Sequence, residues 1–285
     1  MGLFTLVPTL LSCTTMEAHV NGPPALIVAI NAGNVHELDS LLRAGGDPNV
    51  TYFPDQNAVV CAAEGGHTDM MELLIEYGAD VNTRGINHRS VLSYALSYKH
   101  EQIAELLVAH GANVNVGELS PGATPLDFAA TNGMQRGVEF LLAHGADING
   151  DVPDTRTMKE ITNKSMPDRG RSPLLTAANL EMVEYLVAHG ADIRRDPGII
   201  IAQAGLGHTD IVSFLLDRGI DPNVRSQGGS TPLHGVKNAE TAEVLIAHGA
   251  EVNARDGYGL TPLARAVQSG KTDVVTSLVS HGATR

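Results

Sequence analysis

The chain has 285 residues, two cysteines and a formal net charge of −13 at pH 7. The acidic balance argues against a nucleic-acid-wrapping protein or a protein of anionic membrane surfaces, because both need a basic footprint. Cys13 and Cys61 alone cannot form a disulfide framework, so a reducing compartment is expected. We therefore expect a cytoplasmic protein, with a nuclear location allowed and secretion not expected.

The first segment, residues 1–22, begins with a short apolar run at positions 3–11. Leu10, Leu11, Ser12 and Cys13 are similar to a lipoprotein cleavage box. However, no Lys or Arg precedes them, and a run of nine residues cannot span a bilayer. We expect this segment to be an extension, or a cap on the structure that follows it.

The most regular stretch is 124–149, which predicts two helices joined by a tight link. Thr124 before a proline is typical of a helix start, because its hydroxyl can accept free backbone N–H groups. Further on, Val138 and Leu141 belong to an apolar series with the spacing of a helix that buries one face. Gly145 then ends this helix, since glycine readily adopts the left-handed conformation found after helices.

Copies of this unit recur along the whole chain. Their closing glycines are Gly45, Gly78, Gly111, Gly145, Gly190, Gly219, Gly249 and Gly282. Most of the spacings lie near 33 residues, the length of one turn plus two antiparallel helices. Such a unit is too small to bury its own apolar face and is stable only when stacked.

The motifs inside the unit resemble those of the ankyrin-repeat family: a TPL start, an alanine pair, a Gly-His link and a closing HGAD(I/V)N. The resemblance implies an all-α solenoid of eight stacked helix-turn-helix repeats with turn or β-hairpin tips, over residues 23–285. The fifth and seventh repeats lack a few residues between their helices. An insertion at 150–171 separates the fourth repeat from the fifth, and we expect it to be a lid, a binding finger or a disordered segment.

Histidines precede five closing glycines, at His110, His144, His189, His248 and His281. In the last turn of a helix an imidazole can bond to free carbonyls, which we favour over a metal site. Asp127 stands where the family pattern has a histidine; it is either hydrogen-bonded to the neighbouring turn, which we favour, or a reactive acid. The sequence shows no known catalytic signature, so neither a cofactor nor a metal is expected.

The resemblance implies that partners are bound by the tips and by the residues after the alanine pair, along a concave groove. Aromatic and arginine side chains at such places are candidate binding hot spots. The predicted partner-binding residues are Tyr52, Phe53, Arg84, His88, Tyr98, Glu118, Asn132, Arg156, Arg194, Arg195, Arg225 and Tyr258. Tyr52 and Phe53 have a second interpretation, in which they fold back over the first repeat.

The favoured hypothesis is a monomeric adaptor or scaffold that binds another protein in this groove without catalysis. The alternative is a small-molecule-binding protein or unusual enzyme, with a pocket between the insertion and the fourth to sixth repeats. Fold does not settle that choice. For the alternative, the residues to examine are Asp127, Arg156, Lys159, Arg194 and Arg195.

Overall fold

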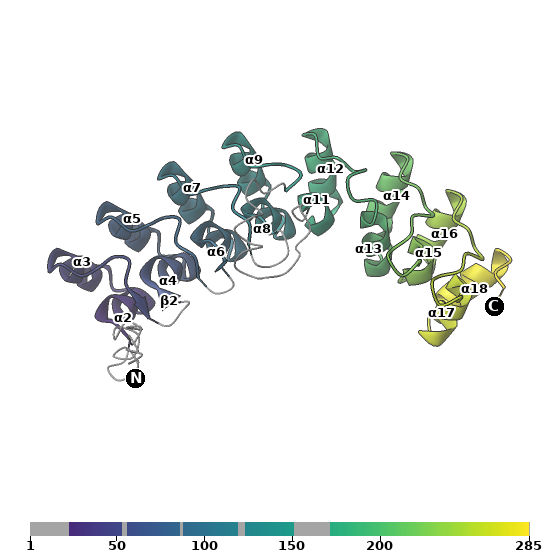
Figure 1. Ribbon diagram of the computed structural model, residues 1–285, viewed down its shortest axis with the longest axis horizontal. Coiled ribbons are helices and arrows are strands. Elements are labelled where there is room, and N and C mark those ends of the chain that lie inside the picture. The colour runs from purple at the N-terminus through teal and green to yellow at the C-terminus, as the bar shows by residue number, and fades with distance from the viewer. Residues whose placement is uncertain (1–22, 53–55, 86–87, 119–122, 151–171, 285) are drawn as a thin grey trace, which may run out of the picture. The chain divides into compact units, whose positions relative to one another are not determined.

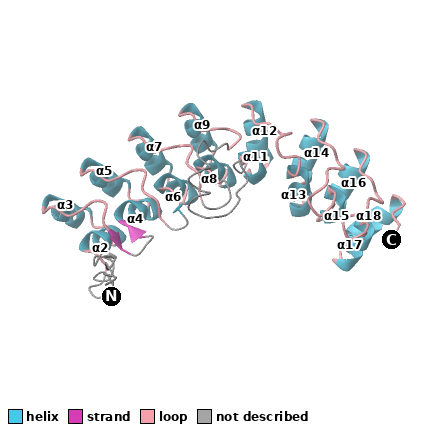
Figure 2. Ribbon diagram, viewed as in Figure 1, coloured by secondary structure: helices cyan, strands magenta, loops and turns pink. Residues whose placement is uncertain are grey.

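The computed structural model shows a helical chain with a single two-stranded hairpin among the residues it describes (Figure 2). The described residues are 23–52, 56–85, 88–118, 123–150 and 172–284. The segment 1–22, Phe53 and the insertion beyond Gly150, with Arg156 and Lys159, lie outside them. The expected all-α fold is confirmed.

The described residues fall into two compact units. Unit 1 contains residues 23–129 and 136–146, and unit 2 contains 130–135, 147–150 and 172–284. The expectation that 23–285 forms one domain stays a prediction.

Unit 1 consists of stacked helix pairs, with one row of first helices and one row of second helices (Figure 1). The first helices are α2 (Ala25–Asn31), α4 (Ala58–Gly65), α6 (Val91–Ser97) and α8 (Pro125–Thr131), whose last two residues belong to unit 2. The second helices are α3 (Val35–Arg43), α5 (Thr68–Glu76), α7 (Glu101–Ala109) and α9 (Gln135–Ala143). Between α3 and α4, β1 (Thr51–Tyr52) pairs antiparallel with β2 (Gln56–Asn57), with Thr51 opposite Asn57.

The helices of unit 1 form where the sequence predicts them, because capping and apolar spacing agree. Asn57 and Ser90 accept backbone N–H groups at the starts of α4 and α6. Leu141 of α9 is fully buried, as the three-and-four spacing requires. After α9, Gly145 has a φ of +84°, which a side chain would resist.

Unit 2 repeats this arrangement with two shortened first helices. Its first helices are α11 (Pro173–Thr176), α13 (Ile199–Leu206), α15 (Pro232–Gly235) and α17 (Pro262–Gln268). Its second helices are α12 (Leu180–Ala188), α14 (Thr209–Asp217), α16 (Ala239–Ala247) and α18 (Thr272–Ser280). The shortened links are held by backbone hydrogen bonds, from Ala178 N–H to Ala130 O and from Lys237 N–H to Ala204 O, each 3.1 Å. Each link thus bonds to the first helix of the preceding repeat, which replaces the missing turn.

Asparagines after the closing glycines join successive repeats. Asn82, for example, donates to Gly111 O (3.2 Å) and accepts the N–H of Asn113 (2.9 Å). Bonds of this kind are made by Asn49, Asn82, Asn115, Asn149, Asn223 and Asn253. In the fifth repeat this position holds Arg194, and only a short connection separates α12 from α13. The fifth and sixth repeats are therefore joined without this asparagine.

Candidate functional site

We call the loop between a second helix and the next first helix a finger. Two arginines tie neighbouring fingers together through backbone carbonyls. In unit 1, Arg84 Nη1 donates to His88 O (3.0 Å) and to Gly117 O of the next finger (2.9 Å). In unit 2, Arg225 Nη1 likewise donates within its own finger and to Arg255 O (2.8 Å). These bonds fix the guanidinium groups in place while the arginine side chains stay exposed.

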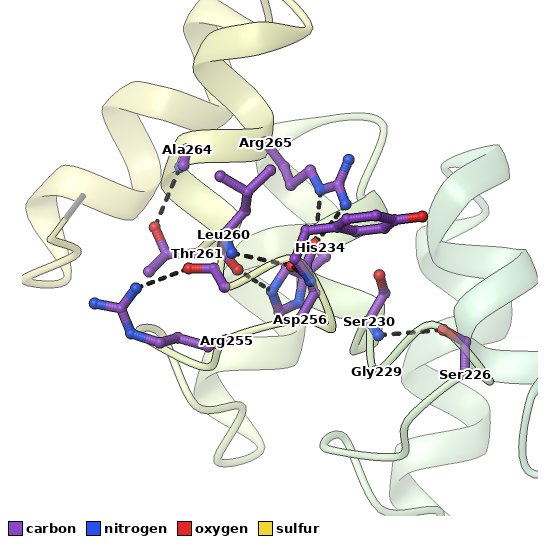
Figure 3. A network of polar contacts seen from close by, with 12 residues as sticks. Ser226, Gly229, Ser230, His234, Arg255, Asp256, Leu260, Thr261, Ala264 and Arg265 are labelled. Carbon is purple, nitrogen blue, oxygen red and sulfur yellow. Dashed lines mark hydrogen bonds and ion pairs between the residues drawn. The ribbon is translucent and has the colours of Figure 1, made fainter.

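Asp256 organises the finger of the eighth repeat (Figure 3). Its side chain is inaccessible to solvent, and Oδ1 accepts the backbone N–H groups of Tyr258 (2.9 Å) and Leu260 (3.0 Å). Oδ2 accepts Nε (2.8 Å) and Nη2 (2.5 Å) of Arg265 in α17. Burial would raise the pKa of Asp256, but the hydrogen bonds from Arg265 and the two amides outweigh it and hold this pKa below its usual range.

Tyr258 lies at the tip of the same finger, and 81% of it is exposed. The guanidinium carbon of Arg265 is 5.3 Å from the centre of its ring, within the range of a cation–π contact. Because Asp256 binds both the backbone of Tyr258 and the side chain of Arg265, one buried carboxylate positions an exposed aromatic ring and a partly exposed cation.

His234 connects the seventh repeat to this finger. Its Nδ1 accepts the backbone N–H of Thr231 (3.1 Å), and its Nε2 donates to Leu260 O (3.1 Å). Burial lowers the pKa of His234, which favours this neutral form. In unit 1 the equivalent residue is Asp127, whose Oδ2 accepts the N–H (2.6 Å) and the hydroxyl (2.9 Å) of Thr124. Asp127 thus bonds to the start of its own helix and is almost fully buried.

Glu118 lies in the finger of the fourth repeat, and only 2% of it is exposed. Its Oε1 accepts the N–H (3.1 Å) and the hydroxyl (3.0 Å) of Ser90, at the start of α6 in the preceding repeat. Burial raises the pKa of Glu118, and hydrogen bonds from Ser93 and Ser90 and the charge of Arg84 offset this only in part. This buried acid therefore joins two repeats at the expense of its own solvation.

Comparison with known families decides what this arrangement is. A family model described as "Ankyrin repeats (3 copies)" matches residues 2–85, 25–118, 84–151 and 199–284, and a single "Ankyrin repeat" model matches 169–196. The chain belongs to the ankyrin-repeat family. The resemblance stated from the sequence is thereby confirmed.

Relatives and solved structures of ankyrin-repeat proteins agree with this assignment. The mouse RelA-associated inhibitor is 36% identical over 94 residues, which are 32% of this chain and 11% of that protein. The mouse cyclin-dependent kinase 4 inhibitor B is 36% identical over 91 residues, 31% of this chain and 69% of that protein. The crystal structure of the human ASB11 ankyrin repeat domain has a TM-score of 0.63 and 26% identity, and covers 81% of this chain and 100% of that domain. The chain thus spans only a small part of some relatives, including the RelA-associated inhibitor.

The structure distributes the predicted partner-binding residues over both units of this ankyrin-repeat chain. Exposed side chains are those of Arg84, Tyr98, Arg194, Arg225 and Tyr258. Half-buried side chains are those of Tyr52, His88, Asn132 and Arg195. Glu118 is buried, so its predicted contact with a partner is left out of the proposed surface. Arg194 and Arg195 follow α12, in the loop that leads to α13.

Arg265 and Arg89 are among the arginines with defined positions that the predicted set did not include. Arg265 binds Asp256, and Arg89 lies over the rings of Tyr94 (5.1 Å) and Phe128 (4.6 Å). Asp256 lies in a loop and Arg265 in the helix that follows it, so the three-and-four spacing of a helix could not predict this pair. Arg89 could have been found from the sequence, because it is an arginine in a finger just before a first helix that contains an aromatic residue.

Four of the five closing histidines, His144, His189, His248 and His281, behave as the capping interpretation predicts. Nδ1 of His144, His189 and His248 bonds to the carbonyl four residues earlier, each at 2.8 Å. Across the described part of the chain, no three His, Cys, Asp or Glu side chains are placed to hold a metal ion. Within that same part, each helix is too short or too polar to cross a membrane.

Proposed function

We propose that this chain is a non-catalytic adaptor that binds a partner protein through its fingers and its row of first helices. Ankyrin repeats generally mediate protein–protein interactions. Two of the relatives have names that refer to other proteins, RelA and cyclin-dependent kinase 4. The partner of this chain is not specified by those names, since each relative matches about a third of it.

The observation that carries the proposal is the exposed ring of Tyr258. A large aromatic side chain that is 81% exposed gains little in the free protein, but it can bury a large area against a partner. Asp256 and Arg265 hold this finger in one conformation before binding. Pre-organisation lowers the entropy lost on association, and Tyr and Arg are enriched among the residues that dominate interface energies.

Site-specific photo-crosslinking tests this proposal. A photoreactive amino acid replaces Tyr258 in one variant and Tyr77 in a matched control. Tyr77 follows α5 in the row of second helices and is 39% exposed. On irradiation in a lysate of the source organism, we expect a specific protein adduct from position 258 and none from position 77.

The captured protein is then purified and its affinity measured. Tyr258→Ala should weaken binding by about 30-fold, equivalent to about 2 kcal/mol, while leaving the melting temperature unchanged. Equal labelling from both positions, or an unchanged Kd for Tyr258→Ala, would show that this finger is not the binding surface.

A further inference from the structure

Charge in unit 2 is divided between its two rows of helices. The first helices α11, α13, α15 and α17 contain no Asp or Glu, and their one arginine is Arg265. The second helices contain no Lys or Arg but seven acids. These acids are Glu181, Glu184, Asp210, Asp217, Glu240, Glu243 and Asp273. In a chain of net charge −13, a negatively charged ligand therefore meets less repulsion at the first-helix row of this unit than at its second-helix row.

Two lysines add positive charge beside this row. Lys237 is exposed and directly follows the C-cap of α15. Lys271 Nζ donates to the two carbonyls at the end of α15 (3.3 and 2.5 Å), so its ammonium lies against the first-helix row. Asp273 is close to Lys271 in sequence, but its carboxylate accepts the backbone N–H of Ala239 (3.1 Å). The Lys271 ammonium therefore faces the first helices, while this acid is directed to the second.

The shortened helix α15 leaves apolar surface open on both sides. It packs between α13 and α17, which present Leu206 (54% exposed) and Val267 (41% exposed). A Cβ added to Gly235 would meet no heavy atom within 4 Å, and one added to Gly205 would meet only Gly235 O, at 3.9 Å. Neither glycine has a positive φ, so the backbone does not require glycine at either position. Bare backbone thus separates two exposed aliphatic side chains.

We infer that this face binds an acidic segment of the partner protein that carries aliphatic side chains. The face consists of Gly205, Leu206, Gly235, Lys237, Val267 and Lys271. The carboxylates of the segment pair with the two lysines, and its aliphatic side chains cover Leu206 and Val267. The bare glycine backbone lets the segment approach closely. This inference rests on the proposed function and adds to it the chemistry of the partner.

A displayed library of random peptides, selected on the whole chain, tests the inference without knowledge of the partner. We expect selected peptides to combine Asp or Glu with Leu, Ile or Val. Their affinity should fall about tenfold with Lys237→Glu and about tenfold with Gly235→Leu, which fills the open space. Arg136→Glu, at an exposed position in α9 of unit 1, is the matched control and should change the affinity less than twofold.

Circular dichroism and thermal melting confirm that each variant is folded before binding is measured. Selected peptides that are neutral or basic, peptides that bind Lys237→Glu unchanged, or no selection at all would each overturn the inference. If crosslinking from Tyr258 succeeds while the peptide results fail, the adaptor proposal stands and only the acidic partner is excluded. If crosslinking fails while acidic peptides bind this face, the finger is excluded instead.

Discussion

Glu118 in unit 1 and Asp256 in unit 2 occupy the same position in their fingers, but their side chains bind different partners. Both backbone N–H groups bond across the finger, Glu118 to Ala123 O (2.9 Å) and Asp256 to Leu260 O (3.0 Å). Asp256 turns back into its own finger and pairs with Arg265. Glu118 extends to the helix start of the preceding repeat, where its partners are hydroxyl and amide groups.

A buried acid can thus either order one finger or join two repeats, depending on which groups lie within its reach. The shorter Asp256 accepts amides of its own loop, and a cation compensates its burial. The longer Glu118 reaches Ser90, 28 residues earlier, and the charge of Arg84 supports its ionised form. Consequently burial prevails at Glu118 and raises its pKa. At Asp256 burial is also the largest single influence, but the hydrogen bonds and the charge of Arg265 together outweigh it and lower the pKa.

Replacing Arg265, the cation that pairs with Asp256, should have the largest effect on stability. Arg265→Leu leaves Asp256 buried with only its backbone partners, so we expect the melting temperature to fall by about 5 to 10 °C. The control is Arg255→Leu, which removes an exposed guanidinium bonded to Gly259 O and should shift the melting temperature by less than about 2 °C. Equal shifts for the two variants would mean that the Asp256–Arg265 pair is not what orders the finger.

At Glu118, losing the hydrogen bonds should destabilise the protein more than losing the negative charge. Glu118→Ala leaves the buried N–H and hydroxyl of Ser90 without this acceptor and should lower the free energy of unfolding by about 2 kcal/mol. Glu118→Gln keeps an acceptor oxygen without a buried charge and should stay within about 1 kcal/mol of the parent. Urea titrations of both variants measure the difference, and a larger loss for Gln than for Ala would refute this account.

The two acids should also give stability profiles of opposite sign in pH. The pKa of Glu118 is raised on folding, so its contribution is fully present below the unfolded pKa and is lost as pH rises through the folded pKa. The pKa of Asp256 is lowered, so its contribution is present above the unfolded pKa and is lost as pH falls through the folded pKa.

Urea midpoints measured from pH 7 down to about pH 3, below the ordinary carboxyl pKa values, test this sign. As the pH falls, the parent should gain stability relative to Glu118→Gln and lose stability relative to Asp256→Asn. The same trend for both variants would contradict the opposite pKa shifts.

The smallest expected effect concerns the backbone of the fingers. His88 has a φ of +54°, where the equivalent residue of the eighth repeat, Gly259, has a φ of +77°. His88→Gly should raise the free energy of unfolding by about 0.5 to 1 kcal/mol, because glycine adopts this conformation without strain. The reverse change, Gly259→Ala, should lower it by about 1 kcal/mol although the added methyl group meets no atom within 4 Å. A gain in both variants would show that positive φ is not the cause.

Sequence reasoning could assign part of the candidate site to the fingers. The exposed positions of Arg84, Arg225 and Tyr258 agree with their prediction as tip residues, because a finger outside the helix stack leaves long side chains in solvent. The same reasoning placed Glu118 at the surface, and it is buried. The prediction followed the position of Glu118 in the loop, whereas burial depends on how closely the preceding repeat approaches.

The repeat period, the helix pairs and the family could be recognised from the amino-acid sequence alone, because they follow from local rules. Helical spacing, capping residues and closing glycines each act over a few neighbouring residues. Only the tertiary structure decided which charged groups meet. Asp256 finds Arg265 nine residues later, and Glu118 finds Ser90 28 residues earlier, once the repeats are stacked. Solvation and partners set the charge of a buried acid, and both come from segments that the local pattern does not bring together.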